Sequence, residues 1–361
     1  MKVQRIETFT REPIGLLRLR TDDGGEGWGQ LSPFSADITA LVLHRQVAPL
    51  AIGADADDLD ALGARVIEGL YKFPGSYVRR ALAGIDTALW DLRGKREGKG
   101  VCELLGGRPR PVPAYASSMR RDTRPEAEAE RVRRLAETEG YRAFKIKIGK
   151  VCGHDEDAWP GRTEAVVPAV RRAVGDRAYL MADANSCYTP ARAIEVGRLL
   201  EDHRFDVFEE PCPYWEVEWT KQVTDALRVD VSGGEQDCFL WQWRRIIAMR
   251  AVDIVQPDVC YLGGLSRTLR VARMAAEAGL RCVPHSANRS MVSVFALHLM
   301  ASIPNAAPFM ECSIEPSKWA EGLFEPALVV CDGALQVPAG PGWGVTINPA
   351  WLASAGRRQS P

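Results

Sequence analysis

The chain has 361 residues, 46% of them hydrophobic, and its 46 lysines and arginines nearly balance its 47 aspartates and glutamates. This balance argues against the basic surface of a nucleic-acid-binding protein, and no apolar run is long enough to span a membrane. The N-terminal sequence MKVQRIETFT lacks the apolar core of a secretion signal, and the nine cysteines show no CxxC pairs or zinc-ligand spacing. We therefore expect a cytoplasmic protein with reduced thiols.

Residues 1–111 predict an α+β domain. The segment LLRLRTDDGGEGWGQ (16–30) is typical of a β-hairpin with a Gly-rich turn. Two segments with helical patterns follow it, at 55–71 and 77–98.

From residue 112 onward, short apolar segments alternate with amphipathic helical segments. Eight such segments predict parallel βαβ units, and eight units in roughly 200 residues predict a (β/α)8 barrel of the TIM type over residues 112–325. A doubly wound sheet is the alternative, but no Gly-rich phosphate turn follows the first strand. We expect the remaining residues, 326–361, to pack back on the first domain and complete it as a cap. The predicted strands are 112–118, 143–149, 178–185, 206–211, 229–235, 252–258, 280–287 and 309–314.

The second of these strands carries two lysines on one face. In FKIKIG (144–149), Lys145 and Lys147 alternate with apolar residues, so both lysines point to the same side. Either this side meets water, or it faces the mouth of the barrel. Polar residues recur near the ends of the strands at intervals close to one βα unit, which favours the mouth, where the active sites of this fold lie. These residues are Lys147, Asp183, Glu209, Glu235, Asp258, His285 and Glu311.

Three consecutive strands contribute a carboxylate each: Asp183, Glu209 and Glu235. Carboxylates at one point repel each other unless a cation lies between them, and an all-oxygen ligand set suits Mg²⁺. We therefore predict one Mg²⁺ per subunit at this trio. A salt-bridge cluster with the lysines is the alternative interpretation.

Basic groups are expected on both sides of this predicted metal. Lys145 and Lys147 lie on one side, and His285 lies on the other with Asp258, whose carboxylate would fix the imidazole tautomer and raise its basicity. Two bases that flank a metal suit removal of the proton next to a carboxylate, with the metal stabilising the resulting enediolate. The sequence does not decide whether Lys147 or His285 takes that proton.

The motifs together resemble the mandelate racemase branch of the enolase superfamily, in which a Lys or His base acts with Mg²⁺. The resemblance covers nearly the whole chain and implies that Asp183, Glu209 and Glu235 hold Mg²⁺. It also implies that Lys147 and the His285–Asp258 pair are opposed acid/base groups. Lys145 would help to hold the substrate carboxylate, and Glu311 would hydrogen-bond that carboxylate or the enediolate. Glu210 would make a structural contact. The motifs are KIK (145–147), DAN (183–185), EEP (209–211), GGE (233–235), QPD (256–258), PHS (284–286) and MEC (310–312).

Further polar residues near strand ends are weaker candidates. Asn185 and Ser117 are candidates for substrate binding. His154, in the insertion 150–161, is a candidate substrate contact, whereas His203 and His298 fall on helices and are expected to be structural. The segments 22–32 and 71–76 are either lids over the barrel mouth or plain surface loops. Residues that follow strand ends and could shape the pocket are Trp215, Tyr261, Asn288 and Arg289.

The resemblance implies a small carboxylate substrate and several reaction types. Dehydration of an acid sugar to a 2-keto-3-deoxy acid ranks first. Racemisation, epimerisation or cycloisomerisation of a 2-hydroxy acid, a sugar-acid lactone or an amino-acid derivative is the alternative, and a non-catalytic scaffold relative is a further one. Capping domains of this branch lie near subunit contacts, so we expect a homo-oligomer of even order, with no nucleic-acid or membrane partner.

Overall fold

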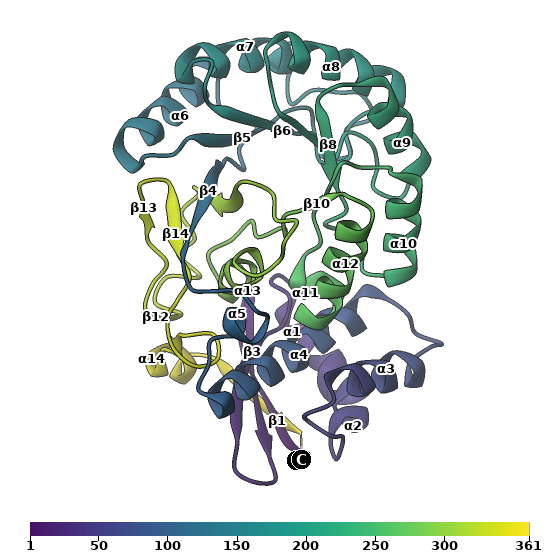
Figure 1. The fold of residues 1–361 in the computed structure, drawn as a ribbon, viewed down its shortest axis with the longest axis vertical. Helices are drawn as coiled ribbons and strands as arrows, with labels where there is room; N and C mark the ends of the chain where they lie inside the picture. The colour runs from purple at the N-terminus through teal and green to yellow at the C-terminus, as the bar shows by residue number, and fades with distance from the viewer. Residues whose placement is uncertain (361) are drawn as a thin grey trace.

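The computed structural model describes residues 1–360, which form a ring of strands enclosed by helices and, below it, a cap of sheet and helices (Figure 1). All eight predicted barrel strands are present. Seven strand pairs are parallel, from β4 to β10 in sequence order and between β11 and β4. β10 and β11 do not pair as strands, and only an isolated bridge between Cys282 and Ala306 lies on that side. The strands are β4 (Pro111–Ser117), β5 (Ala143–Lys147), β6 (Tyr179–Asp183), β7 (Val207–Glu209), β8 (Asp230–Gly233), β9 (Ile254–Val255), β10 (Arg281–Cys282) and β11 (Met310–Ser313).

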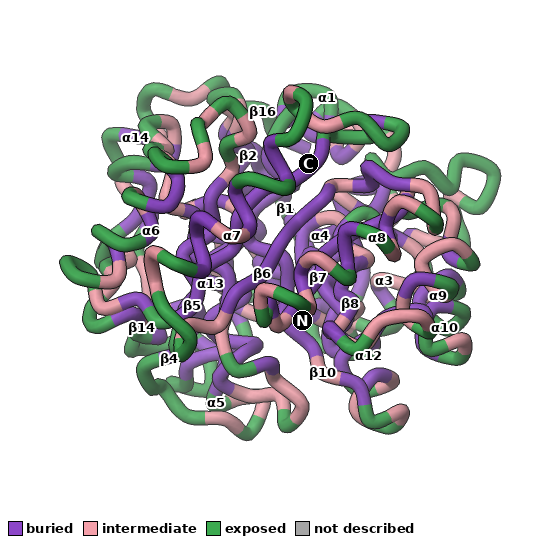
Figure 2. The backbone as a smooth tube through the Cα atoms, turned by 90° about the horizontal axis from the view of Figure 1, so that it is seen from above, coloured by how far each residue is buried: buried purple, intermediate pink, exposed green. Residues whose placement is uncertain are grey.

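Amphipathic helices cover the outside of the ring, with their exposed faces turned away from the buried strands (Figure 2). α8 begins with Thr189 as the N-cap residue and Pro190 at the first helical position, as the sequence predicts. A helix follows each of the first seven strands, but the chain continues from β11 into short strands. The eighth helix of the predicted repeat is therefore absent from the described residues. The helices are α6 (Pro125–Glu139), α7 (Arg162–Val174), α8 (Pro190–Asp202), α9 (Val217–Ala226), α10 (Leu240–Met249), α11 (Val259–Leu262), α12 (Leu265–Glu277) and α13 (Met291–Met300).

The cap contains a four-stranded antiparallel sheet in the order β16, β1, β2, β3. Its longest helix, α4, packs so closely on β3 that a Cβ at Gly29 would lie 2.3 Å from the carbonyl oxygen of Gly84. This close approach explains the alternating glycines of EGWGQ (26–30). The elements are β1 (Val3–Arg11), β2 (Ile14–Thr21), β3 (Glu26–Gln30), α1 (Ala36–Val42), η1 (Leu43–Val47), α2 (Ala48–Ala51), α3 (Leu59–Gly69), α4 (Ser76–Glu97), α5 (Val101–Leu104) and β16 (Gly356–Ser360).

The tail divides its contacts between the two parts of the molecule. β16 pairs with β1, which agrees with the expected return to the cap, but β14 pairs antiparallel with the barrel strand β4. The expectation that the whole tail packs on the cap is therefore too simple, and the boundary at residue 326 stays a prediction. The remaining tail elements are β12 (Phe324–Glu325), β13 (Val330–Cys331), β14 (Ala334–Gln336), β15 (Thr346–Ile347) and α14 (Pro349–Ala353).

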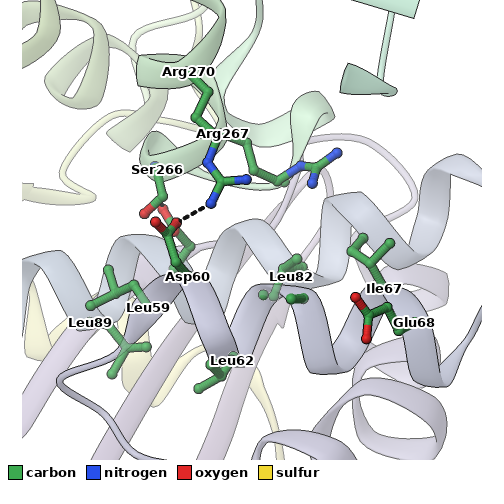
Figure 3. Close-up of a pocket in the computed structure, with 14 residues that line it drawn as sticks. Leu59, Asp60, Leu62, Ile67, Glu68, Leu82, Leu89, Ser266, Arg267 and Arg270 are labelled. Atoms are coloured by element: carbon green, nitrogen blue, oxygen red, sulfur yellow. Dashed lines mark hydrogen bonds and ion pairs between the residues drawn. The ribbon is translucent and has the colours of Figure 1, made fainter. Parts of the chain in front are cut away.

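The cap and the barrel meet where α3 and α4 pack on α12. Asp86 of α4 accepts a hydrogen bond of 3.2 Å from the backbone N–H of Ser266, at the start of α12, and burial raises the pKa of Asp86 to about 6. Beside this contact lies a cavity of about 200 Å³, in which Asp60 and Arg270 form an ion pair of 2.7 Å (Figure 3). None of the candidate catalytic residues lines this cavity.

Within residues 1–360, every helix falls short of the length or the apolar character that crossing a membrane requires.

Candidate active site

The C-terminal ends of the barrel strands bring the predicted ring of polar residues together. Strand register pairs Lys147 with Asp183, and Asp183 with Glu209, across β5, β6 and β7. An isolated parallel bridge pairs Asp258 with His285 beyond the ends of β9 and β10. All of the predicted catalytic and metal-binding residues are at most 8% exposed.

The two lysines of β5 are buried among carboxylates. Lys145 contacts Glu209, and its Nζ lies 2.8 Å from Glu311 Oε1 and 3.8 Å from Asp183 Oδ2. Lys147 contacts Asp183 and donates a hydrogen bond of 3.1 Å to Asn185 Oδ1. Burial lowers the pKa of Lys145, but the surrounding carboxylates, led by Glu209, raise it well above its ordinary value. A polar sheet face open to water, the alternative interpretation of FKIKIG, is therefore wrong.

Acidic groups outnumber basic ones at this site. Three basic side chains, Lys145, Lys147 and His285, face twice as many buried carboxylates. Burial, assisted by the negative charge of Asp183 and opposed by Lys145, raises the pKa of Glu209 to about 8. The buried carboxylates are Asp183, Glu209, Glu210, Glu235, Asp258 and Glu311.

The carboxylate trio has the chemistry of a site for a hard divalent cation but does not form a ready-made cage. Among residues 1–360, no three Asp, Glu, His or Cys side chains lie close enough together to surround a metal ion. The reason is visible in the contacts, since Lys145 and Lys147 pair with Asp183 and Glu209, while His285 Nε2 lies 3.4 Å from Glu235 Oε2. The cluster of buried carboxyl groups and the all-oxygen ligand set fit Mg²⁺. Metal binding by the trio stays a prediction.

Asp258 and His285 form the predicted pair. His285 Nδ1 lies 2.8 Å from Asp258 Oδ2. The other oxygen, Oδ1, accepts hydrogen bonds from the backbone N–H groups of Cys260 (2.7 Å) and Tyr261 (2.9 Å), so Asp258 is also the N-cap of α11. Burial lowers the pKa of His285, but the carboxylates around it, Glu235 foremost, raise that pKa to about 10.

Glu311 and Ser117, both predicted to contact substrate, bond to each other. Ser117 Oγ donates to Glu311 Oε1 at 2.8 Å, and the backbone N–H of Ser286 donates to Oε2 at 2.9 Å. Although burial raises the pKa of Glu311, Lys145 and His285 lower it more, to about 2. Glu311 is therefore ionised and, together with Glu209, holds the ammonium group of Lys145.

Asn185 links three charged side chains. Its Oδ1 accepts hydrogen bonds from Lys147 (3.1 Å) and Arg121 (2.7 Å), and its Nδ2 donates to Glu210 at 3.3 Å. The structural role expected of Glu210 stays a prediction. The sequence pattern gave no signal for Arg121, because it lies in the loop after β4, away from the strand ends.

Two further residues of the site lie inside motifs that the sequence analysis quoted. Gln256, in QPD, donates a hydrogen bond of 2.7 Å to Glu209 Oε2. Ser286, in PHS, binds Glu311 through its backbone. Both are uncharged residues in motifs whose charged members, Asp258 and His285, carry the sequence signal.

The weaker candidates separate into two groups. Tyr261 lies beside His285, with 5.9 Å between ring centres, whereas Trp215 is 54% exposed and His154 is also exposed. Neither Trp215 nor His154 hydrogen-bonds through its side chain to the predicted catalytic residues within residues 1–360. His298 is fully buried and joins Cys102 N to Trp343 O, as a structural histidine would.

The remaining candidates have local roles. Asn288 Oδ1 accepts from the backbone N–H of Ser290 (3.2 Å), and Arg289 donates to the carbonyl oxygen of Ser313 (3.1 Å). His203 is the residue at the C-terminal end of α8.

The two segments predicted to be either lids or surface loops, 22–32 and 71–76, make different contacts. The Gly-rich turn pairs Asp23 with Arg96, near the C-terminal end of α4, so the turn itself lies away from the mouth. The end of the segment reaches the barrel, since Gln30 Nε2 donates to Ser290 Oγ at 2.9 Å. In the segment 71–76, the carbonyl oxygen of Pro74 accepts from Arg79, whose guanidinium lies over Phe239 of the loop after β8.

Comparisons with known proteins identify the family of the chain. Residues 3–106 match the N-terminal domain of mandelate racemase / muconate lactonizing enzyme, and residues 127–351 match the enolase C-terminal domain-like family. The chain is 29% identical to an arabinonate dehydratase of Saccharolobus solfataricus (95% of this chain and 91% of the relative). It is 33% identical to a D-galactarolactone cycloisomerase of Agrobacterium fabrum (94% and 90%).

Solved structures show the same relationship. A proposed racemase from Roseobacter denitrificans is 57% identical and superposes with a TM-score of 0.98 over the whole of both chains. A mandelate racemase/muconate lactonizing protein of Paracoccus denitrificans, complexed with magnesium, is 30% identical, with a TM-score of 0.88 over 99% of this chain and 98% of that one. Sequence, fold and site together show that the chain belongs to the mandelate racemase/muconate lactonizing enzyme family of the enolase superfamily.

Proposed function

We propose that the protein is a Mg²⁺-dependent hydro-lyase that converts a sugar acid into a 2-keto-3-deoxy acid. The placement of Lys147 and His285 carries this proposal. They belong to β5 and to the end of β10, which are three strands apart around the ring in one direction and five in the other. This strand order supports a mechanism in which two proton-transfer groups act from different sides of the buried carboxylates.

The residues have distinct roles in the proposed reaction. Lys145, held between Glu209 and Glu311, supplies a fixed positive charge to the carboxylate of the substrate. Lys147 or His285 removes the proton from C2, and the electron pair of the C–H bond forms a C2–C3 double bond as the 3-hydroxyl leaves. His285 gives that hydroxyl a proton, so water departs, and Asp258 stabilises the imidazolium before this transfer. The enol that is left tautomerises to the 2-keto acid.

Asp183, Glu209 and Glu235 are the residues that would hold Mg²⁺, one ion per subunit. When bound, the ion supplies positive charge that stabilises the negative charge developing on the substrate carboxylate. The magnesium complex of the Paracoccus relative supports this assignment.

Cycloisomerisation is the second candidate, because the relative with 33% identity is a D-galactarolactone cycloisomerase. That reaction also begins with removal of a proton next to a carboxylate, but the leaving group is a lactone oxygen, so no water is released. The racemase proposed for the Roseobacter protein would instead return a proton to the opposite face of C2. The residues of the site are compatible with dehydration, cycloisomerisation and racemisation. The similarity to an arabinonate dehydratase supports dehydration.

The test is a panel of sugar acids and their lactones, incubated with enzyme and Mg²⁺ in D₂O and followed by NMR and a 2-keto-acid reagent. We expect a keto product from at least one sugar acid. Deuterium at C2 with inverted configuration and no keto product would show racemisation or epimerisation. Turnover of lactones alone would show cycloisomerisation. Absence of both a keto product and any exchange at C2 would support a scaffold protein and contradict the proposal.

A further inference from the structure

Arg80, near the N-terminal end of α4, brings a positive charge from the cap to the barrel mouth. Its guanidinium carbon lies 3.7 Å from the centre of the ring of Tyr261, which belongs to α11. Arg80 also donates a hydrogen bond to Ser32 Oγ, at the end of the cap segment that follows β3. A stacked ring and a hydroxyl thus hold the guanidinium in a defined place between cap and barrel.

This place is close to the proposed proton-transfer group. The ring of Tyr261 lies 5.9 Å from the imidazole of His285, and the backbone N–H of Tyr261 binds Asp258. The two separations place the Arg80 guanidinium carbon no more than about 10 Å from the centre of the imidazole. A six-carbon chain with C–C bonds of about 1.5 Å, plus a hydrogen bond of about 2.9 Å at its end, covers such a separation.

Arg80 has no carboxylate partner in the part of the chain that the structure describes. No Asp or Glu oxygen of residues 1–360 lies within 4 Å of its guanidinium nitrogens, and the side chain is only half-buried. Arg93, on the same helix, instead pairs with Glu97 at 3.1 Å. A guanidinium has five N–H donors in a planar fork that matches a carboxylate. Ser32 takes one of these donors, which leaves the others for an anion.

We propose that Arg80 binds a second carboxylate of the substrate, so that the substrate is a sugar diacid rather than a sugar monoacid. The inference rests on the proposed function and refines it. One carboxylate of the diacid lies at Lys145, C2 lies between Lys147 and His285, and the chain extends past His285 toward the cap. The far carboxylate then meets Arg80, with Ser32 keeping the fork in position.

The experiment compares matched pairs of substrates that differ only at C6: galactarate with galactonate, glucarate with gluconate, and mannarate with mannonate. We expect wild-type enzyme with Mg²⁺ to have a kcat/KM at least tenfold higher for one diacid than for its monoacid. Arg80→Gln should lower kcat/KM for that diacid about 10- to 100-fold, mainly by raising KM, since a charge-assisted hydrogen bond made equally in ground and transition states affects binding. It should change the monoacid less than threefold.

Arg93→Gln is the matched control, because it removes the same charge from the same helix at a distance of roughly 20 Å along the axis. It should leave both substrates unaffected. Arg80→Lys keeps the charge but not the fork and should give an intermediate loss. Thermal unfolding of each variant shows whether it is folded.

Two results would overturn the inference while leaving the proposed function intact. One is equal or better use of monoacids, or of their 6-phosphate esters, by the wild-type enzyme. The other is an equal loss for diacid and monoacid in Arg80→Gln, which would mean that Arg80 acts through Tyr261 and Asp258. If no sugar acid reacts, the proposed function fails, and calorimetric binding of the diacids decides the inference. Weaker binding to Arg80→Gln than to wild type supports it, and equal or undetectable binding overturns it.

Discussion

Replacing Asp258 with asparagine tests the pairing at the centre of the proposed mechanism, because the two oxygens of Asp258 have different partners. Oδ1 accepts from the backbone N–H groups of Cys260 and Tyr261, and Oδ2 lies 2.8 Å from His285 Nδ1. An asparagine has one oxygen and an NH₂ group that cannot accept. Its oxygen is required by the two backbone donors, so the NH₂ group faces His285.

This orientation forces the imidazole into the wrong tautomer. Nδ1 of His285 must then accept a hydrogen bond, and the ring proton moves to Nε2, the nitrogen that faces Glu235 at 3.4 Å. The asparagine NH₂ group also opposes protonation of Nδ1, so His285 can neither take a proton at Nε2 as a base nor form the imidazolium that gives a proton to the 3-hydroxyl. A general acid or base contributes about 100- to 10,000-fold to the rate, so we expect Asp258→Asn to lower kcat by that factor with little change in KM.

Asp258→Ala distinguishes this explanation from simple loss of a buried charge. The alanine variant loses the N-cap of α11, which costs about 1 kcal/mol of folding stability, but it leaves Nδ1 free to keep its proton. We therefore expect Asp258→Ala to be less stable than Asp258→Asn yet more active. The assays are formation of the 2-keto acid from an active sugar acid, followed with a 2-keto-acid reagent, and thermal unfolding. An asparagine variant within threefold of wild type, or one more active than the alanine variant, would refute the reasoning.

Three further predictions concern metal, pH and assembly. Chelation should abolish activity, and added Mg²⁺ should restore it. Glu209→Gln should weaken Mg²⁺ binding, measured by calorimetry, without unfolding the protein. Full activity after exhaustive chelation would contradict the predicted need for Mg²⁺. Because burial raises the pKa of Asp86 from 3.8 to about 6, the folded state binds a proton that the unfolded state releases, so stability falls as pH rises through this range. The free energy of unfolding is lower by about 3 kcal/mol at pH 7 than at low pH because of this one group. Asp86→Asn should therefore flatten the dependence of the unfolding temperature on pH between 4 and 7. An unchanged slope would exclude Asp86 as the source of that dependence. Light scattering should give an even multiple of the 39.8 kDa subunit mass, and a monomer at micromolar concentration would disprove the expected oligomer.

The barrel could be predicted because its strands are short, apolar and separated by amphipathic helices of regular length. Every predicted barrel strand is present, and Lys147, Asp183 and Glu209 are neighbours in the strand register, since parallel strands end at the same edge. After β11 the chain continues into short strands rather than into a further barrel helix.

Contacts between segments that are far apart in the chain could not be predicted from the sequence. Arg121 and Arg80 lie on a loop and on a cap helix, and nothing in their local pattern marks them as neighbours of the site. Glycines were also ambiguous: Gly24 has a positive φ of 86° and makes the turn of the β2–β3 hairpin, but Gly29 is required because α4 passes close by. A single sequence does not distinguish these two uses of glycine.

The pairing of β16 with β1 has a consequence for synthesis of the chain. Glu7 and Arg357, which form an ion pair across these strands, are 350 residues apart. As the ribosome releases the chain, β1 is exposed early, with one edge unpaired until the last strand emerges. The barrel strands and helices are all released during that interval, so the barrel can assemble before the sheet of the cap is complete. The sheet of the cap is thus completed only after the barrel segments have been synthesised.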